Sequence, residues 1–296
     1  MRSDWRSNLL IGAGWLAIGI LLVAMGSLLG FLLLRGFSSL NLALFFGDTA
    51  PLDAIRGLHP VWDGIWPACV GTLLLVLLTV ALALFPGIGC GIWLAEYASA
   101  RQKRWLGSAI DILAGMPSIV MGLFGFTLIL LLRDTVLPGA NTSLILAAAC
   151  LALLVLPGIV LTTREALSAL PDDLRLTGAA LGFSQRQQLR FILLPAASRG
   201  ILGGILLACG RAAEDTAVIL LTGVVASAGL AQGLFDKFQA LPFTIYYTAA
   251  QYQTPQELER GFGAALVLLL LSAGLLLLAW GIERSWRARW QSGTAP

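Results

Sequence analysis

The stretch GIWPACVGTLLLVLLTVALALFPGIGCGIWLA, residues 64–95, contains no charged side chain and is bounded by Asp63 and Glu96. About 20 apolar residues are enough for a helix to cross the hydrocarbon core of a bilayer, because each residue adds about 1.5 Å. The stretch therefore predicts a membrane-spanning helix that is longer than the minimum. A tilt of this helix or a break at Pro86 would accommodate the extra length.

The composition of the whole chain agrees with a membrane location. Of the 296 residues, 58% are hydrophobic and 12% are charged, and the mean hydropathy is +0.86. Soluble domains contain about 25% charged residues. We therefore expect an all-α, polytopic membrane protein. The net charge of +3 is small and no dense Lys/Arg face accompanies it, so nucleic-acid binding is not expected.

Similar apolar windows predict six transmembrane helices, which would make residues 1–296 a single transmembrane domain. The first window is charge-free over residues 7–34 and is followed by no clear A-x-A site. A cleaved signal peptide has an apolar region of only about 7 to 15 residues, so we expect an uncleaved span. The predicted spans lie near residues 9–34, 66–95, 112–132, 143–163, 200–224 and 261–282.

The basic residues predict the orientation of these spans. With a cytoplasmic N-terminus, 13 of the 19 lysines and arginines fall on the cytoplasmic side, 5 fall outside, and Arg211 lies within the fifth span. Cytoplasmic loops carry the excess of positive charge in membrane proteins. We therefore expect both termini in the cytoplasm. The 13 are Arg2, Arg6, Arg101, Lys103, Arg104, Arg164, Arg175, Arg186, Arg190, Arg199, Arg284, Arg287 and Arg289.

The sequence gives no indication of a metal centre or of catalytic residues. The four cysteines lie in apolar segments, no C-x-x-C pair occurs, and His59 is the only histidine. Buried cysteines usually act as small apolar side chains. The glycines of GIGCG, residues 87–91, lie at membrane depth, where small residues are typical of close helix packing rather than of a nucleotide loop.

The most polar connection is TTREALSALPDDLRLTGAALGFSQRQQLRFILLPAA, residues 162–197, which lies on the basic side of the predicted membrane. Pro171 can open a helix, and Asp172 and Asp173 are favourable in its first turn because they oppose the helix dipole. Gly178 lies on the face that this short helix shares with neighbouring leucines.

The same connection contains a second helix signal. Gly182 is suited to end the first helix, and Ser184 followed by Gln187 is a capping-box pattern for a second one that runs towards Pro195. Two short helices separated by a glycine form a compact surface unit. From physical principles alone, an ordinary amphipathic connector explains this stretch equally well.

This loop resembles the one with which permeases of ABC importers dock their ATPase subunits. Gly182, nine further residues and ILLP, residues 192–195, match the end of that family's pattern of E-A-A, three residues, G, nine residues and I-x-L-P. Leu176 occupies the position of the family's Glu, whose contact is then lost or replaced by Arg175 or Asp173. The resemblance implies a docking loop over residues 164–195. Its expected contact residues are Asp172, Asp173, Arg175, Gly178, Ala179, Ala180, Gly182 and Pro195.

Three further segments resemble phosphate importer permeases of the PstA/PstC type. They are GIWLAEYAS at 91–99, LAGMPSIVMGLFG at 113–125 and GRAAEDTAVILLTG at 210–223. The resemblance extends over about residues 64–280. It implies the type I ABC importer permease fold in the cell (inner or cytoplasmic) membrane, and inward movement of phosphate by alternating access.

The resemblance also implies partners and cofactors. Such a subunit works with an ABC ATPase dimer, a second homologous permease and an extracytoplasmic phosphate-binding protein. No cofactor is expected on this chain, since it lacks G-x-x-x-x-G-K-[ST], whereas ATP and Mg²⁺ would bind to the ATPase. Another oxyanion, such as sulfate, molybdate or tungstate, is the alternative substrate.

Three charges in the fifth span are the expected substrate pathway. Arg211 lies about 16 Å along the helix from Gly200, close to mid-membrane, and Glu214 and Asp215 at i+3 and i+4 are predicted to reach its guanidinium. Ionisable groups at this depth usually mark a pathway, and an Arg fork suits a tetrahedral oxyanion. The family's R-A-x-G-E-T maps onto residues 211–216, so Thr216 joins the set, while Glu214 replaces a glycine.

Other interpretations of the charged cluster stay open. It could be a structural ion-pair cluster that locks helices together, or it could act together with charges of a partner permease. An intramembrane enzyme would need a nucleophile or metal ligands, and neither G-x-S-x-G nor H-E-x-x-H occurs. A role as a membrane scaffold would explain the spans but not the charges predicted within the membrane.

Overall fold

The computed structural model describes residues 4–135 and 138–291, so Arg2 and the remaining end residues of the predicted domain lie outside it. Within the described residues, six helices are long and apolar enough to cross a membrane, which confirms six spans and the all-α class. The only bridge between extended segments in these ranges joins Val224 to Phe238. The six helices are Ser7–Ser38, Trp66–Tyr97, Ser118–Thr135, Leu144–Ser168, Gln185–Glu214 and Pro255–Leu278.

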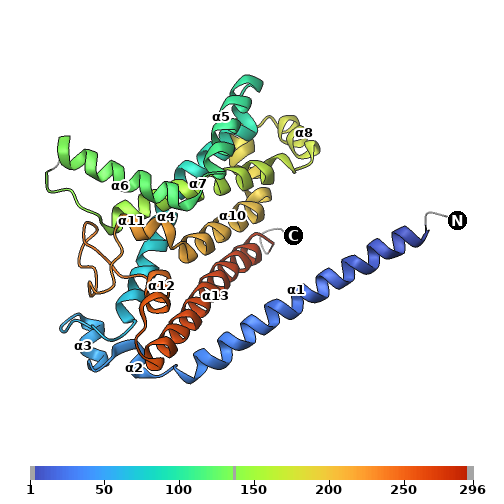
Figure 1. The fold of residues 1–296 in the computed structure, drawn as a ribbon. Helices are drawn as coiled ribbons and strands as arrows, with labels where there is room; N and C mark the ends of the chain where they lie inside the picture. The colour runs from blue at the N-terminus through green and yellow to red at the C-terminus, as the bar shows by residue number, and fades with distance from the viewer. Residues whose placement is uncertain (1–3, 136–137, 292–296) are drawn as a thin grey trace.

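Helix α7 (Leu144–Ser168) is the centre of the bundle, and α4 (Trp66–Ile92) packs along it (Figure 1). Glycines bring these two helices close together. A Cβ atom at Gly87 would lie 2.8 Å from Ile159, and one at Gly91 would lie 2.6 Å from Thr163. The predicted packing role is therefore confirmed for Gly87 and Gly91, whereas Gly89 has open space beside it.

The backbone of α4 does not break at Pro86, which lies inside the continuous helix. The alternative of a break there was wrong. The irregularity comes later, at the π-helical turn η1 (Trp93–Tyr97), where Ala98 N–H donates to the carbonyl of Trp93 at 2.9 Å. Such turns occur frequently at functional sites.

Two helices cover another side of α7. Helix α6 (Ser118–Thr135) packs against α7 and against the short α11 (Ala217–Thr222). A Cβ atom at Gly125 would clash with both Cys150 and Thr222, so the three helices meet closely. The amphipathic α5 (Ala100–Ala114) precedes α6, and the third span begins after Pro117 rather than at the predicted residue 112.

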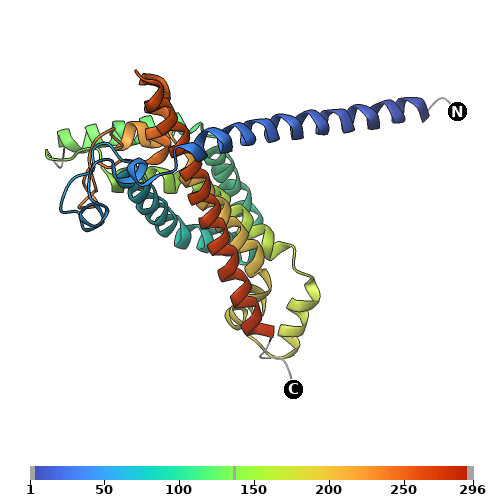
Figure 2. The same ribbon diagram turned by 90° about the horizontal axis from the view of Figure 1, so that it is seen from below.

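Helix α1 (Asp4–Ser38) leaves the bundle, and both views show its amino-terminal part far from every other element (Figures 1 and 2). The carboxyl end of α1 meets the amino-terminal part of α13 (Pro255–Gln291). There, the rings of Phe31 and Phe262 form an edge-to-face contact with centroids 5.5 Å apart.

Short helices form the segments on the side opposite the predicted docking loop (Figure 1). They are α2 (Leu42–Phe46) and α3 (Pro51–Arg56) after α1, and α12 (Leu241–Gln251) before α13. The backbone N–H of Leu241 donates to Thr72 Oγ1 at 2.9 Å, which ties α12 to α4.

Candidate functional site

The predicted fifth span is divided in the structure. Helix α10 (Leu194–Glu214) ends at Glu214, and Asp215 has extended backbone angles of φ −73° and ψ 117°. The short α11 then continues from Ala217 to Thr222. A single helix over residues 200–224 was therefore wrong, and the interruption falls within the expected pathway residues.

The interruption also changes the predicted ion pairs. Because Asp215 leaves the helical path, it no longer lies one turn above Arg211. Its Oδ1 instead accepts the N–H of Val218 at 2.9 Å, which satisfies an unpaired donor in the first turn of α11. Among residues 4–135 and 138–291, no ion pair includes Arg211, so the predicted pairing with Glu214 and Asp215 was wrong.

Arg211 and Glu214 instead share an open groove of about 420 Å³ on the surface of this chain. Both side chains are exposed, whereas Asp215 and Thr216 are half-buried at the start of α11. Val155 lines the same groove, and it lies eleven residues, or about 16 Å, from the beginning of α7. The two charges therefore lie level with the middle of a spanning helix.

Glycines shape the two sides of α10 differently. Gly200 and Gly204 pack closely against Ala166 and Thr162 of α7, as expected for small residues. Gly203 and Gly210 have open space beside them within this chain, and Gly210 lines the groove with Arg211. The groove face of α10 therefore leaves room for a helix of another chain to pack against it.

The first helix of the docking loop forms as predicted, as α8 (Asp172–Ala180). Gly182 follows it with a left-handed φ of +75°. The N–H of Phe183 donates to the carbonyl of Gly178, and the N–H of Gly182 donates to that of Ala179. This is a Schellman motif, which satisfies the last carbonyls of the helix and requires a residue that accepts a positive φ.

The second helix begins at the predicted capping box. The backbone N–H of Ser184 donates to Gln187 Oε1 at 2.9 Å, and that of Gln187 donates to Ser184 Oγ at 3.4 Å. The helix then continues through α9 (Gln185–Gln188) and the π turn η2 (Leu189–Leu193) into α10. Pro195 does not end it, so the second helix of the loop and the fifth span are one continuous helical run, Gln185–Glu214.

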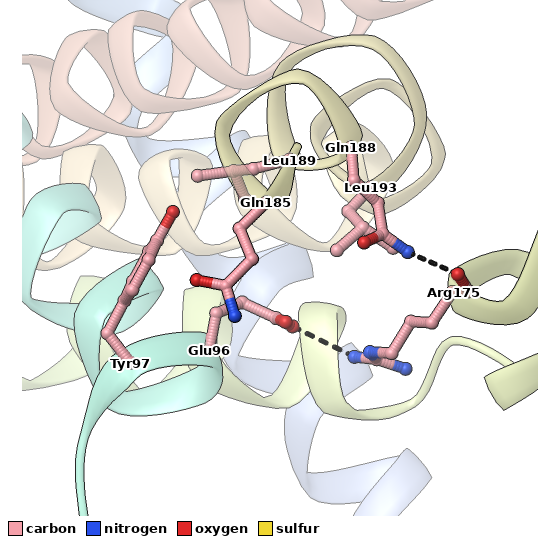
Figure 3. A pocket seen from close by; sticks show the side chains of 7 residues that line it. All are labelled: Glu96, Tyr97, Arg175, Gln185, Gln188, Leu189 and Leu193. Atoms are coloured by element: carbon pink, nitrogen blue, oxygen red, sulfur yellow. Dashed lines mark hydrogen bonds and ion pairs between the residues drawn. The ribbon is translucent and has the colours of Figure 1, made fainter. Parts of the chain in front are cut away.

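Gly178 allows the two parts of the docking loop to touch. It is buried, and a Cβ atom there would lie 3.1 Å from both Gln188 and Ile192. Gln188 Nε2 also donates to the carbonyl of Arg175 at 2.7 Å (Figure 3). α8 is therefore fixed to the start of the helix that leads to Arg211.

Arg175 faces inward rather than outward. Its Nη2 donates to Glu96 Oε1 at 2.9 Å (Figure 3). The same Nη2 donates to the carbonyl of Leu167 at 3.0 Å, and Nη1 donates to the carbonyl of Leu170 at 3.1 Å. The hydrogen bond to Glu96 raises the pKa of Arg175 above its ordinary value. Arg175 is thus occupied within the chain and is not free to replace the family's Glu in a docking contact.

The remaining predicted contact residues lie at the surface, apart from Gly178. Asp172, Asp173, Ala179, Ala180 and Gly182 are exposed, and Pro195 is half-buried. The sequence prediction missed two exposed leucines beside them: Leu176 and Leu181 are each 66% exposed. The departure from the family's pattern at Leu176 was the available signal for an apolar element on this surface.

Comparison with known proteins places this architecture among transporters. Residues 87–287, which include the docking loop and the groove, match the family "Binding-protein-dependent transport system inner membrane component". The phosphate transport system permease protein PstA of Haemophilus influenzae is 32% identical over 278 residues, 92% of this chain and 93% of its own. PstA of Xylella fastidiosa is 32% identical over 249 residues, 82% of each chain.

A solved structure supports the fold. The chain resembles one from the MetNI methionine ABC transporter in an inward-facing conformation, with a TM-score of 0.58 and 18% identity, over 80% of this chain and 99% of that one. Six apolar helices and a family match over most of the chain agree with one another. This multi-pass membrane protein belongs to the family of binding-protein-dependent transport system inner membrane components.

Proposed function

We propose that this chain is a permease subunit of an ATP-driven ABC importer that moves inorganic phosphate inward by alternating access. The observation that carries the proposal is the exposure of Arg211 and Glu214 beside the middle of a spanning helix. Charges at this depth are costly against lipid and usually face a pathway. The relatives named as phosphate permeases support phosphate as the substrate.

The interrupted helix supports the same conclusion. Between Glu214 and Ala217 the backbone leaves the helical hydrogen-bond ladder. Irregular backbone at membrane depth is tolerated only where it is buried in protein or lines a watery cavity. With Asp215 engaged at α11, Arg211 is the group proposed to meet the anion, and Glu214 accompanies it along the groove.

The groove needs a second wall, which we assign to a second homologous permease. The exposed face of α10 carries Gly203 and Gly210, which allow another helix to approach closely. An ATPase dimer would bind the docking loop and supply ATP and Mg²⁺, and an external binding protein would deliver the anion. No cofactor is assigned to this chain.

The continuous helical run gives the coupling a mechanical route. An ATPase that moves α8 also moves the attached start of the run Gln185–Glu214. Arg211 lies in the last turn of that run. Rocking of the docking loop would therefore change the side of the membrane from which Arg211 is accessible. This mechanism requires no covalent chemistry in this chain.

Uptake by the reconstituted complex tests the substrate. We expect proteoliposomes that hold both permeases and the ATPase to import radiolabelled phosphate when ATP is enclosed with the ATPase and the binding protein is outside. A large excess of unlabelled phosphate should reduce the signal strongly, whereas the same excess of sulfate, molybdate or tungstate should leave it unchanged. Competition by one of those three anions alone would reassign the substrate.

Both termini are proposed to be cytoplasmic. In a background without the native cysteines, we expect single cysteines at positions 50 and 236 to react with an impermeant maleimide from outside intact cells. A cysteine at position 290 should react only after permeabilisation. The excess of lysine and arginine in the segments assigned to the cytoplasm supports this outcome. Labelling of position 290 in intact cells would contradict it.

A further inference from the structure

The guanidinium of Arg175 joins three separate elements of the chain. It belongs to α8, it donates to the carbonyl of Leu167 in the last turn of α7 and to that of Leu170 just after this helix, and it donates to Glu96 of η1. A cation at the carboxyl end of a helix is favourable because it meets unpaired carbonyls. Its position is therefore determined by several partners at once.

The ion pair between Glu96 and Arg175 is partly shielded from solvent. The two side chains are 18% and 27% exposed, and the nitrogen and oxygen are 2.9 Å apart. The pair lines a pocket of about 180 Å³ together with Tyr97, Gln185 and Gln188 (Figure 3). Arg175 also forms a longer ion pair with Asp172, at 3.4 Å. That pair is open to solvent, because the Asp172 side chain is 92% exposed.

Glu96 connects this pair to α4. It lies in η1, which follows α4 without a break, so a displacement of Glu96 acts on the end of a 27-residue helix. Along its length, α4 packs on α7 and also on α10. One buried cluster contains Val76 and Ala83 of α4 together with Ala208, Ala212 and Ala213, which flank Arg211.

We propose that the Glu96–Arg175 ion pair transmits movement of the docking loop to α4, as a second route to the pathway beside the continuous run into α10. The inference rests on the proposed function. With two routes, α4 and α10 move together when the docking loop moves. Without the pair, α8 would keep its contacts with the end of α7 and the start of the run into α10. Movement of α8 would then reach α4 only indirectly, through the packing of those helices on it.

The test measures ATP hydrolysis of the reconstituted complex with and without its binding protein, because this ratio requires communication across the permease. We expect Glu96→Gln to assemble with the ATPase and to lower the ratio at least tenfold. A tenfold change corresponds to about 1.4 kcal/mol, which is comparable to the loss of a charge-assisted hydrogen bond. The matched control is Asp111→Asn, which makes the same change from carboxylate to amide at an exposed acid of α5 outside the docking loop and should keep the ratio.

Exchange of the two charges makes the result specific. Glu96→Arg alone should lower the ratio further, and Glu96→Arg with Arg175→Glu should recover part of it. Recovery will be incomplete because a carboxylate at position 175 cannot donate to the carbonyls of Leu167 and Leu170.

Two results would overturn the proposal. One is a wild-type ratio in Glu96→Gln, and the other is a loss of assembled complex with an unchanged ratio per complex, which would make the pair purely structural. The ratio is measured from ATP hydrolysis and does not follow a transported anion. A wild-type complex that its binding protein stimulates but that imports no phosphate would contradict the proposed substrate and leave this test valid.

Discussion

Replacement of Arg211 by alanine should abolish phosphate uptake while the complex still assembles. The side chain is exposed in this chain and belongs to none of its ion pairs within the described residues, so its removal leaves no cavity and no unpaired partner here. Truncation of a charge that contacts a charged partner typically costs about 2–5 kcal/mol. Uptake per assembled complex should therefore fall by about 30-fold or more, measured as radiolabelled phosphate per ATPase-bound permease.

Arg211→Lys is the matched variant for geometry. Lysine retains the charge as a single ammonium but lacks the planar fork that binds two oxygens of an oxyanion at once. We expect uptake between that of the alanine variant and that of the wild type. Full activity of Arg211→Lys would show that only the positive charge matters.

A double variant distinguishes two roles for Arg211 and Glu214. They could line the substrate pathway, or they could form ion pairs that hold this chain against the second permease. Arg211→Leu with Glu214→Leu removes both exposed charges and leaves the cap that Asp215 provides for Val218. Well-packed apolar side chains can replace a buried ion cluster at little cost in stability. A structural lock would therefore retain assembly and transport in the double variant. Normal phosphate uptake by that variant would contradict the pathway.

The spans could be predicted because each is long and poor in charge, and membrane insertion responds to that property alone. The break at Glu214 was missed because Arg211, Glu214 and Asp215 also fit the spacing of one helical face. A signal was present, since Asp215 and Thr216 directly precede the apolar run AVILLT. Asp and Thr before such a run are typical of a helix start.

The docking loop was predicted more accurately because its signals are local. The Ser184 capping box and the turn at Gly182 depend on residues a few positions apart, and both formed as expected. The Glu96–Arg175 ion pair joins residues 79 positions apart. No periodicity or motif reports such a contact. For that reason the sequence predicted a contact between Arg175 and the ATPase, whereas in the structure Arg175 binds Glu96 within the chain.

The turn at Gly182 gives the second large expected effect. We expect Gly182→Val to insert into the membrane normally, to lose most of the ATPase on copurification and to lose phosphate uptake. Gly182 has a φ of +75°, where a β-branched residue is strained. Strain of this kind costs about 1–3 kcal/mol, which is enough to open the Schellman motif and to separate α8 from α9.

The space around Gly182 allows a control that separates backbone strain from contact. No heavy atom lies within 4 Å of a Cβ atom placed there, so the first side-chain atom meets nothing in this chain. Asparagine is similar in size to valine but tolerates a positive φ. Gly182→Asn should therefore retain docking and uptake if the turn geometry matters. Equal damage by both substitutions would mean that the ATPase contacts this position directly. Unchanged docking and uptake in Gly182→Val would mean that the loop is only a connector.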